Sequence, residues 1–219
     1  MIKGKKDWTA LSVLGINFEC LIWFVILFYG ILFLFRLLLD YFLFKRKSEK
    51  LKKMFLTQVQ KRNGRIIQQG IFSHPRLMIP YQGMDVMIYL FPGYLRKPPF
   101  SRIETKLSTV INFTLEIFKE DFWSYLVKSL GLKDLQTHNP AFDKAFLIKA
   151  NNESLARDFL TTELQDFLIN RKLNHLRLEI KNQLFRFFTK DSPNNEEQLE
   201  ELIETGLAFL NQVKQKLLS

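Results

Sequence analysis

The chain has 219 residues, of which 32 are Lys or Arg and 22 are Asp or Glu, giving a formal net charge of +10. Such a charge is typical of nucleic-acid-binding proteins, but it is concentrated at one end. Residues 1–62 hold twelve basic and four acidic residues, whereas residues 63–219 hold twenty and eighteen. The basic excess belongs to the N-terminal region, and we do not expect a nucleic-acid partner.

An uncharged segment near the N-terminus has the length and composition of a membrane span. Between Cys20 and Phe35 no residue is charged, and twelve of these sixteen residues are Leu, Ile, Val or Phe, each of which favours insertion by roughly 0.3–0.6 kcal/mol. Three leucines follow Arg36, so a span over about residues 18–39 places Arg36 at one edge, where its long side chain can reach water. The sequence predicts one transmembrane helix in an anchor region, residues 1–44.

Three alternatives to a single span are open. A buried core helix is disfavoured because the segment is apolar on every face over the length that a bilayer requires. A cleavable signal peptide is disfavoured because no small-x-small site follows the apolar core. Two spans within residues 8–44 would need about forty residues and a loop, and no Pro or polar turn interrupts this stretch.

Three charged residues flank the span and are candidates for contact with partner subunits. Glu19 and Arg36 are seventeen residues apart, which corresponds to roughly 25 Å along one helix, against a hydrocarbon thickness of about 30 Å. They cannot pair with each other. We expect Glu19, Arg36 and Asp40 to meet polar groups on another chain or lipid headgroups.

A run of basic residues follows the span and predicts its orientation. Loops rich in Lys and Arg stay in the cytoplasm, and this run outnumbers the three lysines of the N-terminal tail. Each such charge also gains about 1 kcal/mol from anionic lipid headgroups. We predict a basic juxtamembrane helix, residues 45–62, and a cytoplasmic C-terminal domain, residues 63–219. The basic collar consists of Lys45, Arg46, Lys47, Lys50, Lys52 and Lys53.

The first half of the predicted domain has the pattern of strands. Helix-forming residues continue to residue 60, and Asn63 and Gly64 then end the predicted helix. Alternating apolar residues and flanking turn residues then predict a sheet with one covered face. The predicted strands cover residues 65–73, 85–91, 105–119 and 142–150, with a short helix over 121–132.

The second half has the pattern of helices around a hairpin. Apolar spacing predicts one broken helix within residues 151–172, whose second part Thr161 or Thr162 could cap. Residues 175–180 and 184–189 predict a hairpin, and a helix is expected from about Asn195. Its glutamates, at positions 196, 197, 200, 201 and 204, are expected to form a solvated face. The predicted class is α+β, with a mostly antiparallel sheet and flanking helices.

The segment DLQTHNPAFDKAFLIKANNESLARDFLTTELQDFL resembles an element of uncharacterised bacterial single-span, membrane-anchored α+β proteins. In these, a Phe-Asp pair, a short apolar strand and a helix that breaks at Leu-Thr precede a C-terminal hairpin and helix. The resemblance covers residues 130–218 and implies fold and membrane location, with no activity to carry over. The matching residues are Phe142, Asp143, Phe146, Ile148, Glu153, Ala156, Leu160, Thr161 and Leu164.

Signatures of catalysis or metal binding are not found in the sequence. The three histidines are far apart, and the single cysteine, Cys20, allows no disulfide framework or thiolate cluster. Asp134, His138 and Asp143 lie near the Asn139-Pro140 turn, and we expect a loop there and not a ligand set. Nucleophile-elbow and phosphate-binding glycine motifs are also missing. We predict no enzymatic activity, no cofactor and no metal.

Aromatic residues in the segments LFRFFTK and INFTLEIF raise the possibility of single-stranded RNA binding. Sheets that bind RNA carry exposed rings together with basic residues. We do not expect this arrangement here, and assign the 22 phenylalanines to the core and the span.

The sequence-based function hypothesis is a non-catalytic accessory subunit or assembly factor of a larger membrane protein complex. Other membrane subunits and anionic headgroups are the expected partners, in a hetero-oligomer at a bacterial inner or other energy-transducing membrane. The alternative is a membrane-tethered module that recognises a soluble ligand or peptide. An enzyme acting on lipids is a third.

Overall fold

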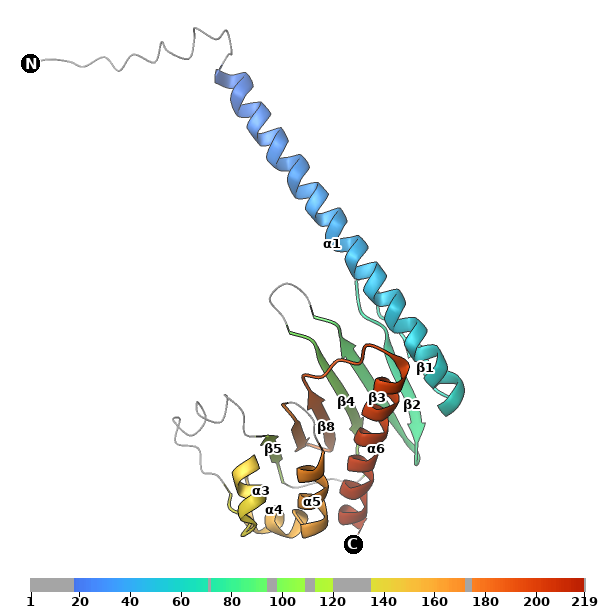
Figure 1. Cartoon of the computed structure of the whole chain (residues 1–219), viewed down its shortest axis with the longest axis vertical. Helices are drawn as coiled ribbons and strands as arrows, with labels where there is room; N and C mark the ends of the chain where they lie inside the picture. The colour runs from blue at the N-terminus through green and yellow to red at the C-terminus, as the bar shows by residue number, and fades with distance from the viewer. Residues whose placement is uncertain are drawn as a thin grey trace, which may run out of the picture. The chain divides into compact units, whose positions relative to one another are not determined.

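The computed structural model describes residues 18–70, 72–93, 98–108, 113–119, 135–171 and 175–218. It confirms the α+β class, with one antiparallel sheet of eight strands and a long N-terminal apolar helix (Figure 1). The elements are α1 (Phe18–Arg62), β1 (Arg65–Ile67), β2 (Arg76–Tyr81), β3 (Met84–Phe91), β4 (Phe100–Lys106), β5 (Leu115–Lys119), α3 (Pro140–Ala145), β6 (Phe146–Ala150), α4 (Glu153–Phe159), α5 (Thr162–Asn170), β7 (Arg177–Lys181), β8 (Leu184–Thr189) and α6 (Glu196–Leu218).

The chain divides into two compact units, residues 1–47 and 48–219. In the first unit, helix α1 is exposed along its whole apolar stretch, from Cys20 to Asp40. Among the described residues, α1 is the one helix long and apolar enough to cross a membrane. The unit therefore offers apolar surface on all sides of the helix.

The second unit begins fifteen residues before the predicted domain boundary at residue 63. The reason is that the end of α1 belongs to the core of the sheet domain. Leu51, Met54 and Phe55 are buried at helical spacing, and Phe55 is 0% exposed. The segment predicted as a basic juxtamembrane helix thus contains a core helix from Ser48 onward.

The strands lie in the order β1-β2-β3-β4-β8-β7-β5-β6. Successive side chains of a strand point to opposite faces, and one face of this sheet is apolar and buried. The end of α1 and helix α6 contribute to the same core cluster. The buried positions include Leu77, Ile79, Val86, Ile88, Ile103, Leu115, Ile117, Ile148, Leu178, Ile180, Phe185 and Phe187.

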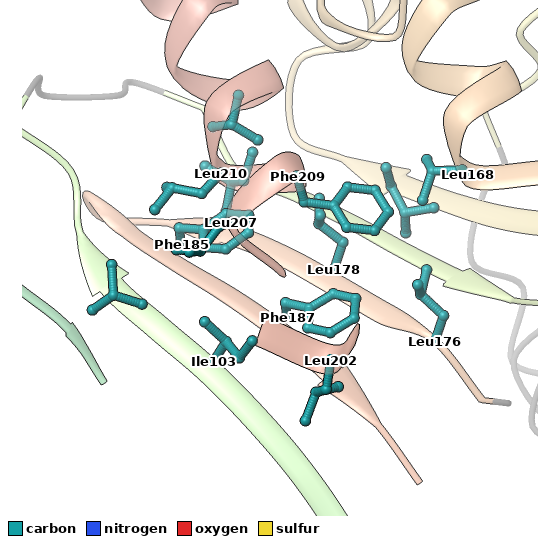
Figure 2. Packing of buried hydrophobic residues seen from close by; sticks show 14 of the residues in the cluster. Ile103, Leu168, Leu176, Leu178, Phe185, Phe187, Leu202, Leu207, Phe209 and Leu210 are labelled. Atoms are coloured by element: carbon teal, nitrogen blue, oxygen red, sulfur yellow. The ribbon is translucent and has the colours of Figure 1, made fainter. Parts of the chain in front are cut away.

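Helix α6 packs directly on this buried face (Figure 2). The ring of Phe209 lies 5.4 Å from that of Phe187 and 4.7 Å from that of Phe167, measured between centroids. At Gly206 an added Cβ would collide with the Ile103 side chain, which is itself fully buried. Glycine is required because the helix and strand β4 approach so closely.

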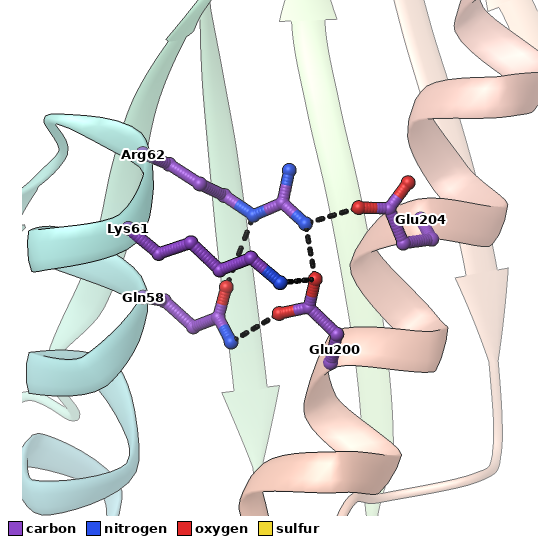
Figure 3. Close-up of polar contacts among 5 residues, drawn as sticks. All are labelled: Gln58, Lys61, Arg62, Glu200 and Glu204. Atoms are coloured by element: carbon purple, nitrogen blue, oxygen red, sulfur yellow. Dashed lines mark hydrogen bonds and ion pairs between the residues drawn. The ribbon is translucent and has the colours of Figure 1, made fainter.

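A polar cluster, here called the α1–α6 clamp, joins the end of α1 to α6 (Figure 3). The Glu200 carboxylate accepts hydrogen bonds from Lys61 Nζ, Arg62 Nη2 and Gln58 Nε2, each at 2.6 Å. Arg62 also pairs with Glu204 and donates from Nε to Gln58 Oε1 at 3.0 Å. The expectation that all glutamates of this helix form a solvated face is wrong for Glu200, whose side chain is 25% exposed, whereas Glu204 is 61% exposed although it pairs with Arg62.

The clamp changes the acidity of Glu200. Burial alone would raise its pKa, but the hydrogen bonds from Lys61 and Gln58 and the charge of Arg62 outweigh burial and lower the pKa to about 2. The clamp therefore favours the ionised carboxylate in the folded state.

Several predicted elements are confirmed and keep nearly their predicted bounds. These are strand β3, the broken helix α4 and α5, the β7-β8 hairpin and helix α6. Thr161 is the N-cap of α5, although its side chain makes no capping hydrogen bond. The hairpin turns at Asn182 and Gln183, which both have positive φ, as the mirror-image turns of hairpins require.

Three strand predictions differ from the structure. The strand predicted over residues 65–73 ends at Ile67, and strand β2, which contains Pro80, was not predicted. Strand β1 pairs with β2 only as far as Met78, so the missing N–H of Pro80 interrupts no pairing there.

The strand predicted over residues 142–150 begins at Phe146, because a short helix, α3, precedes it. Asn139 caps this helix by accepting from the N–H groups of Ala141 and Phe142, and Pro140 occupies its first position. The prediction of one continuous strand over residues 105–119 is wrong in its middle. Residues 107–108 and 113–114 do not belong to a strand, and they lie between β4 and β5. The helix predicted over 121–132 lies outside the described residues.

Replacing Phe55 with Ala should destabilise the sheet domain by about 3–5 kcal/mol, because a fully buried ring leaves a cavity. The matched control is Leu56→Ala at the next position, where the side chain is 53% exposed. Urea unfolding of the purified chain, monitored by far-UV circular dichroism, measures the free energy of unfolding of both variants. Equal midpoints for the two variants would contradict the assignment of the end of α1 to the core.

Replacing Glu200 with Gln should lower the free energy of unfolding at neutral pH by about 1–2 kcal/mol, after allowance for partial exposure. A carboxylate with a depressed folded-state pKa stabilises the protein above its ordinary pKa of 4.5. That stability is lost as the pH falls from about 4.5 to about 2, so the difference between the two proteins should vanish over this range. The control is Glu197→Gln, at an exposed position of the same helix. A constant difference down to pH 2 would argue against the clamp.

Candidate functional site

The face of the sheet opposite the buried one, here called the open face, carries charged and aromatic side chains. The strand register aligns them in two rows that run across the strands, and all but the buried Glu179 keep partial exposure. The first row consists of Arg76, Tyr89, Arg102, Phe188, Arg177 and Phe118. The charged part of the second row consists of Glu104, Arg186, Glu179, Glu116 and Lys149.

In the first row, arginines and aromatic rings alternate from strand to strand. The Tyr89 ring has the guanidinium carbon of Arg102 at 4.1 Å from its centre and that of Arg76 at 4.7 Å. The Phe188 ring has Arg102 and Arg177 at 5.8 Å each. Each ring thus lies beside the cations of both neighbouring strands, an arrangement that attracts through the ring quadrupole.

The alternation continues to the β6 edge. The Phe118 ring has Arg177 at 4.9 Å and the ammonium group of Lys149 at 5.5 Å from its centre. Three rings in succession therefore have cations on both sides across the sheet, and the first row is a continuous cation and aromatic ladder.

In the second row, carboxylates hold the arginines in place. Arg186 lies 3.5 Å from Glu104 and 3.3 Å from Glu179, measured between nitrogen and oxygen. Arg177 reaches down from the first row to Glu116 at 3.4 Å and to Glu179 at 3.6 Å. The ion pairs connect strands β4, β8, β7 and β5, and they fix the guanidinium planes relative to the sheet.

A hydrogen bond also joins the two rows near strand β3. Tyr89 Oη donates to Glu104 Oε1 at 2.6 Å. Burial and this bond raise the pKa of Tyr89, although the charges of Arg76 and Arg102 oppose the shift. The phenol therefore stays protonated at neutral pH and remains a donor.

The arginines of the open face have donors to spare. The Nε atoms of Arg102, Arg177 and Arg186 are buried and have no hydrogen-bond acceptor. Two of them lie 3.3 and 3.5 Å from Glu104 Oε2, without the alignment that a hydrogen bond needs. Planar guanidinium groups of this kind bind carboxylates and phosphates. The side chains of Arg102, Arg177 and Arg186 are 29%, 42% and 33% exposed, so the open face can accept an anionic partner at their outer ends.

The residues predicted to contact partner subunits belong to the first unit. The side chain of Glu19 lies outside the described residues, whereas Arg36 and Asp40 are exposed on α1. Their contacts to other chains stay predictions.

Most residues of the basic collar are exposed, namely Lys45, Arg46, Lys50 and Lys53. Lys52 pairs with Glu49 at 3.4 Å, one turn away on the same helix, and Lys47 is half-buried. The collar spans the boundary between the two units, and lipid contact stays a prediction for its residues.

The side chains around His138 make structural hydrogen bonds, and Asp143 lies on helix α3 and not in the expected loop. Asp143 accepts hydrogen bonds from Thr137 N at 2.9 Å and Thr137 Oγ1 at 2.7 Å, and His138 Nε2 lies 3.0 Å from Arg157 Nη1. Asp134 lies outside the described residues. Within the part of the chain that the structure describes, no three His, Cys, Asp or Glu residues gather as a metal site.

The open face was missed at the sequence level. We expected no arrangement of exposed rings with basic residues, and this expectation is wrong, since the first row combines both. Alternate positions of SRIETK, RLEIK and LFRFF carry charged or aromatic residues, which signals a polar face. Which of them are neighbours depends on strand order, which the local pattern does not contain.

No protein-family model matches this chain, and no curated protein matches it in sequence. Among solved structures, the chain is similar to the crystal structure of the mycobacterial trehalose monomycolate transport factor A, TtfA, with a TM-score of 0.50 and 12% identity. The similarity covers 78% of this chain and 93% of that one. At this identity it concerns the fold alone.

Proposed function

We propose that the protein is a non-catalytic, single-span accessory or assembly factor of a larger membrane protein complex, with its sheet domain in the cytoplasm. The observation that carries this proposal is the exposed apolar run of α1, residues 20–39, in a chain whose sheet domain has a separate core. Helix α1 anchors the protein, and the domain acts on neighbours at the membrane surface.

The composition of α1 supports an anchor. Large side chains such as Trp23, Phe24 and Leu27 are 64–69% exposed. Soluble monomers rarely expose contiguous apolar patches of more than a few hundred Å², and a helix that is apolar all round is stable in lipid. Exposed Phe and Trp side chains can also pack against neighbouring spans.

The open face supports a role in binding a partner and not in catalysis. Its charged groups are tied to one another by ion pairs and ring contacts, as at Arg177 and Arg186. The fold is shared with a protein described as a transport factor, which is consistent with an auxiliary role in a membrane process.

The open face also favours a second candidate, a membrane-tethered module that binds a soluble ligand or peptide. The two functions differ in the state of the protein in the membrane. An accessory factor is part of a stable hetero-oligomer, whereas a tethered module is extracted alone.

Extraction in mild detergent followed by native-size analysis should find the chain in a large assembly. Glu19→Gln should reduce the share in that assembly by about threefold, the usual effect of one interhelical hydrogen bond in a membrane. Insertion should be unaffected, because removing a charge can only ease it.

Glu49→Gln is the matched control for this experiment, because Glu49 lies beyond the span and pairs with Lys52. A chain that migrates as a monomer in both variants and in the parent would favour the tethered module. Extraction of the chain by carbonate or high salt would refute the membrane anchor.

Protease added to sealed, right-side-out vesicles should leave residues 48–219 intact, because the stronger cationic flank follows the span. Changing the six basic collar residues to Gln should make part of the population sensitive, since the orientation bias is then removed. Digestion of the parent domain before lysis would reverse the proposed orientation.

A further inference from the structure

The arginines of the first row recur at every second strand. Arg76 is on β2, Arg102 on β4 and Arg177 on β7, and one strand lies between each successive pair in the sheet. Neighbouring strands are about 4.8 Å apart, so successive cations are spaced by about 9.6 Å. A regular spacing of positive charge therefore crosses the sheet.

This spacing matches a chain in extended conformation. Three residues of polyproline II complete one turn and span about 9 Å, so side chains at every third position lie on one side and would meet successive cations. A helical ligand would need charges about six or seven residues apart. The spacing selects an extended ligand with one charge in three.

The contacts within the first row argue against nucleic acid as that ligand. Single-stranded nucleic acids bind by stacking bases on free aromatic faces. Here Tyr89, Phe188 and Phe118 each have cations within 6 Å of the ring centre on both sides. The cations compete with bases for these rings.

The second row limits the charge density of the ligand. Glu104, Glu179 and Glu116 lie beside the arginines and would repel a chain with a charge at every unit. Carboxylates that are spaced apart can approach the exposed parts of Arg102 and Arg177, whose side chains are 29% and 42% exposed.

We propose that the open face binds an acidic segment of a partner protein, held in extended conformation, with a carboxylate at every third residue. The guanidinium groups of the first row receive these carboxylates, as arginine clusters do in other acidic-motif readers. The inference names the chemistry of the partner and so rests on the proposed accessory function.

The test uses the full chain in detergent micelles and two fluorescent twelve-residue peptides. One repeats Asp-Ser-Pro, and the other has the same composition with its four aspartates adjacent. Fluorescence anisotropy at low salt should give an affinity about fivefold higher for the repeating peptide. A single-stranded RNA oligonucleotide of equal charge is the third probe.

The variant Arg102→Gln with Arg177→Gln should weaken binding of the repeating peptide by about tenfold, because it removes two of the three first-row arginines and exposed charge pairs are individually weak. The control pair is Lys144→Gln with Lys214→Gln, on helices α3 and α6, which contribute Phe142 and Phe209 to the buried core, and it should change binding less than twofold. If the domain with both arginine substitutions does not fold, Arg76→Gln, at the end of the first row, is tested instead. It should weaken binding of the repeating peptide by about threefold.

Equal affinity for the two peptides, or unchanged binding in the arginine variants, would overturn the proposal. Tighter binding of the RNA would overturn it in favour of nucleic acid. The assay needs no membrane and no native complex, so its failure is separable from failure of the accessory function, which the native-size analysis tests.

Discussion

The domain depends on one constraint. Side chains alternate between the two faces along each strand, and one face of the sheet is covered by helices. Strands β2, β3, β4, β8, β7 and β5 place apolar residues on the buried side, so their intervening positions must share the other face. A one-residue slip of any strand would exchange the two sets. The burial of residues such as Phe185 and Phe187 therefore fixes the register, and the register in turn places Arg186 and Phe188 among their neighbours.

The open face adds specificity more than stability. Ion pairs between partly exposed groups contribute roughly 0–1 kcal/mol each, and cross-strand pairs contribute on a similar scale. These contacts fix the positions of the side chains relative to one another, because Arg102, Arg177 and Arg186 each contact groups on both adjacent strands. A surface that is pre-organised by its own contacts loses little conformational freedom on binding. The same contacts that orient the arginines thus favour recognition of a partner.

The sequence predicts elements whose signal is local. Period-two alternation identifies strand β3 and the β7-β8 hairpin, and helical spacing identifies α6. Strand β2, which contains Pro80, was not predicted, and α3 was hidden by an apolar run that reads as strand until Asn139 is recognised as a cap. The rows of the open face could not be predicted, because β4 pairs with β8, some eighty residues later. The α1–α6 clamp is likewise non-local, since Arg62 and Glu200 are 138 residues apart.

Helix α1 must satisfy two environments within one continuous element, and its composition changes accordingly. From Cys20 to Phe35 its residues are uncharged and exposed, a composition suited to lipid. From Ser48 the apolar positions narrow to a stripe through Leu51 and Phe55, as a protein core requires. The lysines between these parts suit neither interior and mark the transition. Because the stripe and Glu200 both need the second part of α1, the anchor cannot be cut away at residue 62 without opening the core. Residues 48–62 of α1 are therefore part of the sheet domain and not a separable linker.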